Sequence, residues 1–149
     1  MTNDQFHLRP ATADDAATIA TLLTELGYRA RPADIPERLT AVIREGGTVL
    51  LAIDDDSTPL GLMCLARHSA VHSPGPVAYI TALVTTFAAR RRGVGRVFVE
   101  CAKDWAAENG CVRVTVTSAE HRTDAHAFYP AVGMPYTGRR FSAMLDENA

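Results

Sequence analysis

The way hydrophobic patterns change along the 149 residues is the feature that most constrains the fold. Three apolar runs of strand length, at residues 48–53, 60–66 and 77–85, precede a segment, 94–105, in which apolar residues recur three or four positions apart. Short apolar runs between turn residues are typical of strands, whereas the wider spacing is typical of an amphipathic helix. This part of the chain therefore predicts three consecutive strands followed by a helix.

The other expected elements flank this part of the chain. They are a strand at 6–9, helices at 13–26 and from Pro32 to the Gly46-Gly47 break, a strand at 112–117, a helix at 123–132 and a closing strand at 141–145. Hairpins join antiparallel strands, and a strand, helix, strand connection is right-handed and parallel. The sequence thus predicts an α/β (α+β) fold of order β-α-α-β-β-β-α-β-α-β, with a mixed sheet and helices on both faces.

Composition and charge exclude several classes of protein. With 47% hydrophobic and 21% charged residues and no linker or repeat, we expect a single domain over residues 1–149. No apolar run approaches the roughly 20 residues that span a bilayer, and the N-terminus does not resemble a signal peptide, so we expect a cytoplasmic protein without a membrane partner. A net charge of -2 argues against a general nucleic-acid binder. The three cysteines lack metal-ligand spacing, so we expect free thiols and no metal.

The positive charge is concentrated before the helix at 94–105. Four arginines fall within seven positions, at Arg90, Arg91, Arg92 and Arg96, together with Gly93 and Gly95. A helix N-terminus with glycines and arginines is suited to a phosphate or pyrophosphate, although a glycine turn beside solvated arginines is the alternative interpretation. The G-x-x-x-x-G-K-[S/T] motif is absent and the third glycine of the dinucleotide motif is missing, which argues against ATP and NAD.

Two motifs in the sequence resemble those of the GNAT superfamily of acyl-coenzyme-A-dependent N-acetyltransferases. Residues 90–95 match the pattern R/Q-x-x-G-x-G/A between a strand and a long helix. Residues 125–129, Ala-His-Ala-Phe-Tyr, with Gly133-Met134 are similar to the segment A-x-x-F-Y…G-F. With Ser118 and Arg122, the second segment also resembles the branch that contains aminoalkylphosphonate and some aminoglycoside acetyltransferases.

The resemblance implies an N-acetyltransferase domain that uses acetyl-CoA as cosubstrate. Main-chain groups of Leu83, Val84 and Thr85 would pair with the pantetheine arm. The implied contacts with the rest of the coenzyme are Arg90, Arg91, Arg92, Gly93, Val94, Gly95, Arg96, Arg122 and Phe128. Tyr129 would lie near the sulfur as general acid, because a phenol with a pKa near 10 is protonated at pH 7 and can donate a proton to a leaving thiolate. The alternative interpretation of Tyr129 is a partly buried aromatic residue whose hydroxyl bonds to the backbone.

The acceptor implied by the family is a primary amine, here of a small molecule, attacking the thioester directly. The residues that could bind or deprotonate it are Glu25, Tyr28, His68, His72, Glu120, His121 and His126, and the sequence does not choose among them. The family also allows a homodimer. Because Pro130 follows Tyr129 and disfavours helical geometry before it, the alternative hypothesis is a noncatalytic CoA-binding sensor or interaction module.

Overall fold

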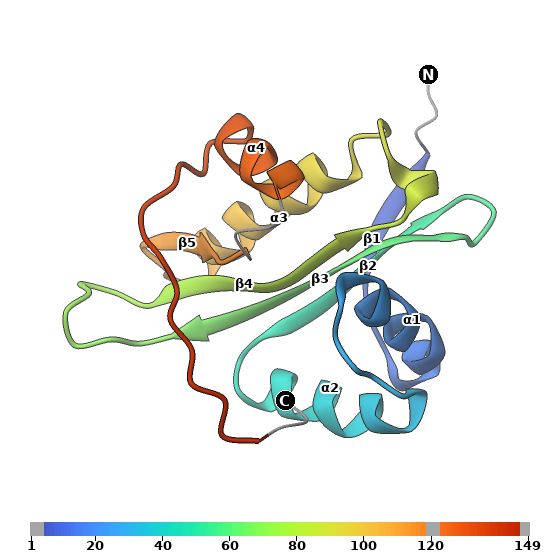
Figure 1. Ribbon diagram of the computed structural model, residues 1–149, viewed down its shortest axis with the longest axis horizontal. Helices are drawn as coiled ribbons and strands as arrows, with labels where there is room; N and C mark the ends of the chain where they lie inside the picture. The colour runs from blue at the N-terminus through green and yellow to red at the C-terminus, as the bar shows by residue number, and fades with distance from the viewer. Residues whose placement is uncertain (1–4, 119–122, 147–149) are drawn as a thin grey trace.

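The computed structural model describes residues 5–118 and 123–146, whose arrangement is shown in Figure 1. Within these ranges, the strands are β1 (Phe6–Pro10), β2 (Thr48–Asp54), β3 (Pro59–His68), β4 (Val77–Thr85) and β5 (Arg113–Val116). The helices are α1 (Ala16–Leu26), α2 (Ile35–Arg44), α3 (Val94–Glu108) and α4 (Thr123–Ala131), with short 3₁₀ turns at Ala13–Asp15, Pro32–Asp34 and Phe87–Ala89. Each of the elements expected up to residue 132 is confirmed, with ends that shift by a few residues.

The described strands form one mixed sheet in the order β1-β2-β3-β4-β5. Neighbours are antiparallel up to β4, and β5 lies parallel to β4. Figure 1 shows α1 and α2 on one face of the sheet and α3 and α4 on the other. The predicted mixed sheet with helices on both faces is therefore confirmed.

Successive side chains of the strands point to opposite faces of the sheet, so the hydrophobic core has two layers, one on each face. Leu51 and Ile53 belong to the cluster under α1 and α2, with Ile19, Leu22 and Leu39. The residue between them in β2, Ala52, belongs to the opposite cluster, where Phe98 of α3 is fully buried. Because strand side chains alternate in direction, one strand supplies apolar groups to both layers.

The parallel pair β4 and β5 separates part of the way along β4. Its register runs from Val77↔Arg113 to Ile80↔Val116, where β5 ends, and β4 continues to Thr85. At the same point β4 contains an extra residue, Thr81, because Cys64 of β3 lies opposite Ala82 while Leu65 lies opposite Ile80. A β-bulge bends a strand and increases its twist. The described residues of β4 beyond the bulge pair with β3 alone, which leaves one main-chain edge open.

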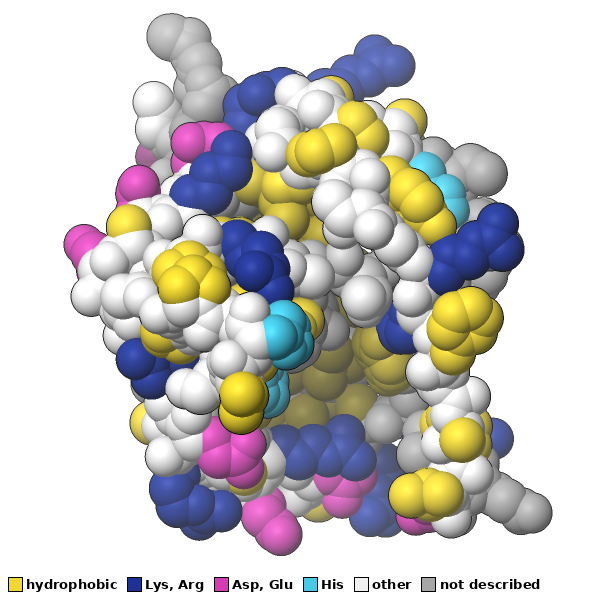
Figure 2. Space-filling view, turned by 90° about the vertical axis from the view of Figure 1, so that its left-hand side faces the viewer, with side chains coloured by type: hydrophobic (Ala, Val, Ile, Leu, Met, Phe, Trp, Pro, Cys, Tyr) yellow, Lys and Arg dark blue, Asp and Glu magenta, His cyan; other side chains and the backbone are white. Residues whose placement is uncertain are grey.

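The closing strand predicted at 141–145 is wrong. Residues 132–146 form no helix or strand, and the segment runs from α4 past the β4 side of the sheet toward α2 (Figure 1). A strand needs a main-chain hydrogen-bonding partner, and Pro135 and Gly138 interrupt the segment before the apolar residues. Phe141 and Leu145 are 89% and 99% exposed. In Figure 2 hydrophobic side chains, in yellow, stand out along the right-hand edge, where this segment runs.

In the described part of the chain, none of the helices combines the length and hydrophobicity needed to cross a bilayer.

Candidate functional site

The loop between β4 and α3 leads into a helix start without a side-chain cap from the described residues. Within the loop, the N–H groups of Arg90 and Arg92 donate to the carbonyl oxygens of Phe87 and Ala89 at 3.2 Å. Gly93, the N-cap of α3, has a left-handed backbone with φ 79°, and no side chain of the described residues caps the first turn. Arg91 is left-handed as well, with φ 67°. The first N–H groups of a helix have no hydrogen-bond partner within the helix, and they carry a partial positive charge. A residue with left-handed backbone geometry can turn neighbouring N–H groups toward the same side of the chain. The start of α3 is therefore a surface suited to an anion.

The four arginines of this loop differ in their surroundings. The Arg90 guanidinium lies 5.2 Å from the centre of the Phe87 ring, and Nη1 of Arg92 lies 3.8 Å from Oδ2 of Asp54. Arg91 and Arg96 are exposed and form no ion pair with a described residue. The first turn of α3 carries no acidic residue. The loop is thus positively charged. The charge of Arg92 is partly neutralised by the Asp54 carboxylate, so less of it is available to a ligand than the charge of Arg91 or Arg96.

Helix α4 is packed on the first turn of α3 through Phe128. A Cβ atom on Gly95 would lie 3.1 Å from Cζ of Phe128, so this glycine allows the close approach. The Phe128 and Tyr129 rings meet edge to face, with centres 5.2 Å apart. Phe128 therefore joins α4 to the first turn of α3, and Tyr129 is the next residue of α4.

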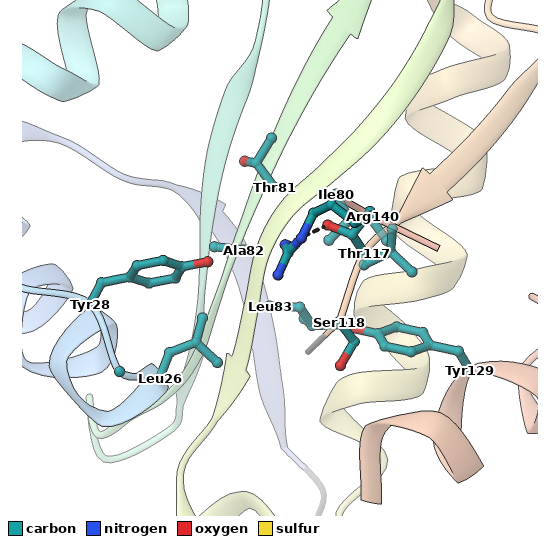
Figure 3. A pocket seen from close by; sticks show the side chains of 12 residues that line it. Leu26, Tyr28, Ile80, Thr81, Ala82, Leu83, Thr117, Ser118, Tyr129 and Arg140 are labelled. Carbon is teal, nitrogen blue, oxygen red and sulfur yellow. Dashed lines mark hydrogen bonds between the residues drawn. The ribbon is translucent and has the colours of Figure 1, made fainter. Parts of the chain in front are cut away.

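A cavity of about 220 Å³ lies where β4 and β5 separate (Figure 3). Its lining comes from the end of α1, from β4, from β5 and the residues after it, from α4 and from the C-terminal segment. The lining residues are Leu26, Gly27, Tyr28, Ile80, Thr81, Ala82, Leu83, Val116, Thr117, Ser118, Tyr129 and Arg140. The cavity therefore brings together residues more than a hundred positions apart.

Tyr129 lies in the wall of this cavity. Figure 3 shows its ring reaching from α4 toward Ser118 and Leu83. Pro130 is part of the last turn of α4, and the backbone remains helical through Ala131. A proline near the end of a helix removes one N–H donor without ending the helix before it. Pro130 therefore does not move Tyr129 out of the cavity.

Arg140 lines the cavity although no sequence pattern predicts it there. Nη1 of Arg140 donates a hydrogen bond to Oγ1 of Thr117 at 3.1 Å. The hydroxyl of Ser118, a residue the sequence analysis named only for its resemblance, is buried and finds no hydrogen-bond partner among the described residues. Arg140 comes from a segment with no regular pattern, so no sequence signal pointed to its position.

The expected acceptor residues are not gathered at one place. Tyr28 lines the cavity, whereas Glu25 lines a separate pocket of about 300 Å³ beside Thr86. His72 is exposed in the loop between β3 and β4, and His68 packs edge to face on Tyr79 at 5.1 Å. His126 is exposed on α4 and is not part of the lining. Glu120, His121 and Arg122 lie outside the described residues.

The three cysteines are free thiols and none lines the cavity. Burial raises the pKa of the Cys64 thiol to about 12. Burial, and then the negative charges of Asp104 and Glu108, raise the pKa of the Cys101 thiol. Since the thiolate is the nucleophilic form, neither residue is activated for attack at neutral pH. No group of three His, Cys, Asp or Glu side chains in the described ranges is arranged to hold a metal ion.

Together, the mixed sheet, the uncapped start of α3 and the cavity between β4 and β5 define an α/β fold with two features suited to a phosphate-bearing ligand. Residues 16–134 match the model of the Acetyltransferase (GNAT) family. The chain belongs to this family, which confirms the resemblance recognised in the sequence.

One curated protein is similar to the chain in sequence, and several solved structures are similar to it in fold. The chain is 31% identical over 93 residues to a curated Bacillus subtilis (strain 168) protein, "Uncharacterized N-acetyltransferase YhdJ", and the alignment covers 62% of this chain and 65% of that protein. The chain therefore spans slightly less than two thirds of that relative. Three solved structures share the fold over 95% of this chain. They are a transcriptional regulator from Bacillus halodurans C-125 (TM-score 0.85, 20% identity, 100% of that chain), glucosamine-6-phosphate N-acetyltransferase from Arabidopsis thaliana (0.81, 17%, 99%) and an aminoglycoside antibiotic 6'-N-acetyltransferase from Acinetobacter baumannii (0.81, 18%, 98%).

Proposed function

We propose that this protein is an N-acetyltransferase that moves the acetyl group of acetyl-CoA to a primary amine of a small molecule, by direct attack of the amine on the thioester. The observation that carries the proposal is the position of two adjacent residues of α4. Phe128 lies against Gly95 in the first turn of α3, while Tyr129 lines the cavity between β4 and β5. An anion-binding loop and a cavity with a phenol are thereby held next to each other.

The residues at the start of α3 fit the diphosphate of acetyl-CoA. No other described part of the chain lies within 4 Å of the position that a Cβ on Gly93 would take, so there is open space beside this residue. In the proposal, the N–H groups of Arg91 and of residues 93–96 bind the phosphates, with the Arg90, Arg91 and Arg96 side chains nearby. The N–H of Arg92 donates to the carbonyl oxygen of Ala89 at 3.2 Å instead. Main-chain groups of Leu83, Val84 and Thr85, on the open edge of β4, hold the pantetheine arm as an added strand would be held.

Acetyl-CoA supplies the acetyl group as an activated thioester. The task left to the chain is to place that group and to protonate the departing sulfur. Tyr129 is the proposed general acid: as the new N–C bond forms and the C–S bond breaks, its phenol, protonated at pH 7, donates a proton to the departing thiolate. The phenolate then regains a proton from solvent, which takes up the proton that the attacking nitrogen loses. Direct attack is favoured over a covalent enzyme intermediate because none of the three thiols lines the cavity and burial keeps Cys64 protonated.

A small-molecule acceptor is proposed because the cavity is small and lined from five parts of the chain. Two of the structural neighbours are named for small acceptors, glucosamine-6-phosphate and an aminoglycoside antibiotic. A cytoplasmic location remains a proposal supported by the three free thiols.

A homodimer is proposed as well. It is supported by apolar side chains on the C-terminal segment that lie open to solvent, Tyr136, Phe141, Met144 and Leu145. A native mass measurement would decide the subunit number, and would also show whether coenzyme stays bound through purification.

The central test is release of free CoA thiol from acetyl-CoA by the purified protein with a panel of primary amines. We expect release that depends on an acceptor and saturates with both substrates. Calorimetric titration with acetyl-CoA alone measures binding independently. Saturable binding without acceptor-dependent release would favour the noncatalytic module, and absence of binding would overturn the assignment of the α3 loop.

A further inference from the structure

The cavity contains one charged side chain among the described residues that line it, Arg140. Its guanidinium is held by the hydrogen bond from Nη1 to Thr117 Oγ1, drawn as a dashed line in Figure 3. Arg140 forms no ion pair with a described residue. The cavity therefore holds a positive charge that no carboxylate of the described part of the chain balances.

The rest of the described lining is neutral. Hydroxyl groups come from Tyr28, Thr81 and Tyr129, and the buried Ser118 hydroxyl has no partner in the described ranges. Glu25, the nearby acidic residue on α1, lines the other pocket and not this one. In Figure 3 the guanidinium lies between the Tyr28 phenol on one side and Thr117 on the other. Among the described residues, none supplies a negatively charged group to this guanidinium.

A simple amine is a poor match for this cavity. Arg140 and its hydrogen bond to Thr117 are exposed, so solvent screens part of its charge, but an ammonium group and a guanidinium in the same cavity still repel each other. An oxyanion on the same ligand makes the interaction with Arg140 attractive, because the planar guanidinium binds carboxylate and phosphate groups with two parallel hydrogen bonds. The same positive charge then favours the neutral form of the amine, which is the form that attacks a thioester.

We propose that Arg140 binds an oxyanion of the acceptor, so that the substrates are small primary amines that also carry a carboxylate, phosphate or phosphonate group. This inference rests on the proposed function. Arg140 acts in it as a specificity-determining residue. The diphosphate surface is a separate place, because it lies at the start of α3, whereas Arg140 faces Thr117 in the fork between β4 and β5.

The test uses amine pairs that differ in the anion. Ethanolamine is compared with O-phosphoethanolamine, and propylamine with β-alanine, which separates phosphate from carboxylate recognition. The variants are Arg140→Met, which removes the charge, and Arg140→Lys, which keeps it without the planar fork. Arg139→Met is the matched control, since Arg139 is the adjacent arginine and is not part of the described lining. Circular dichroism confirms that each variant is folded.

For the wild type we expect kcat/KM to be about 10- to 100-fold higher for an anionic member than for its neutral partner, as for hydrogen bonds to a charged group. Arg140→Met should remove this preference by raising KM for the anionic amine, with KM for acetyl-CoA unchanged. Arg140→Lys should restore part of the preference for the anionic amine, and Arg139→Met should leave that preference unchanged. Equal use of both members of every pair, a preference that survives Arg140→Met, or a matching rise in KM for acetyl-CoA would overturn the inference.

Calorimetric binding of the same amines, with CoA present, separates the inference from the proposed function. Binding of an anionic amine that is lost in Arg140→Met supports the inference even if no thiol is released, and in that case the enzymatic proposal fails alone. Thiol release with neutral amines only supports the proposed function and overturns the inference. If none of the amines binds or reacts, the inference is overturned.

Discussion

Nη1 of Arg92 lies 3.8 Å from Oδ2 of Asp54, which directs the third arginine of the run at residues 90–92 toward the turn between β2 and β3. Oδ1 of the same carboxylate accepts hydrogen bonds from the N–H groups of Asp56 and Thr58, at 2.9 and 2.8 Å. The carboxylate thus orders the turn and neutralises part of the charge on Arg92. In a pattern of adjacent arginines, the side chains are not equivalent.

Substitution of individual arginines should separate their roles. Arg96→Ala should weaken acetyl-CoA binding by about tenfold, because an exposed guanidinium near the diphosphate is removed. Arg92→Ala should have a smaller effect on binding and should lower the free energy of unfolding by about 0.5–1 kcal/mol, as for a partly exposed ion pair. Calorimetric titration and urea unfolding measure the two quantities. A larger loss of affinity in Arg92→Ala than in Arg96→Ala would contradict this division.

Two substitutions at Gly93 separate the effect of backbone strain from the effect of negative charge at the start of α3. Its φ of 79° disfavours any residue with a Cβ, so Gly93→Ala should destabilise the protein by about 1 kcal/mol and weaken acetyl-CoA binding only slightly. Gly93→Asp adds a negative charge beside the same N–H groups and should abolish measurable binding. Retained binding in Gly93→Asp, with Gly93→Ala as the matched control, would mean that the diphosphate lies elsewhere.

The phenol of Tyr129 is expected to matter for turnover and not for affinity. Tyr129→Phe should lower kcat by about 10²- to 10⁴-fold, the range for loss of a general acid, while the dissociation constant of acetyl-CoA stays within about threefold. Tyr136→Phe is the control, because Tyr136 is 73% exposed on the C-terminal segment. If kcat of Tyr129→Phe equals that of the control, Tyr129 is not the acid.

Asp15 links the end of β1 to the start of α1. Its carboxylate accepts hydrogen bonds from Nη1 and Nη2 of Arg9, at 2.9 and 2.8 Å, and from the N–H of Thr12 at 2.8 Å. The hydrogen bonds from Arg9, followed by those from Thr12, outweigh the effect of burial and hold the pKa of Asp15 below its ordinary value. We expect Asp15→Asn to lower the free energy of unfolding at pH 7 by about 1–2 kcal/mol.

The pH dependence of this contribution has a definite sign. A carboxyl group with a lowered pKa in the folded state stabilises the protein above its unfolded pKa of about 3.9, and the contribution is lost as the pH falls through the folded pKa. The difference between wild type and Asp15→Asn should therefore shrink below about pH 4. Thermal unfolding from pH 7 to pH 3, with Asp14→Asn as control, measures it. A difference that is constant over this range would show that ionisation is not involved.

The type and order of the elements could be predicted because they depend on local patterns. Alternation in β2 and three-to-four spacing in α3 distinguish strand from helix within a few residues. Gly27, with φ 109°, ends α1 where the pattern places it. The wrong prediction of a strand at residues 141–145 also comes from a local pattern. An apolar run can resemble a strand, but a strand forms only where another segment of the chain offers main-chain hydrogen bonds.

Some features of the candidate site could likewise be predicted from the sequence, and others could not. The sequence by itself determined the glycines and arginines before α3 and the Phe128-Tyr129 pair, since a helix start suited to an anion is a local structure. Tertiary structure alone decided that β4 and β5 separate beside Tyr129, that Arg92 faces Asp54 and that Arg140 reaches Thr117 from the far end of the chain. Such contacts join residues distant in sequence, and their geometry depends on the packing of the whole sheet and its helices, which no local pattern encodes.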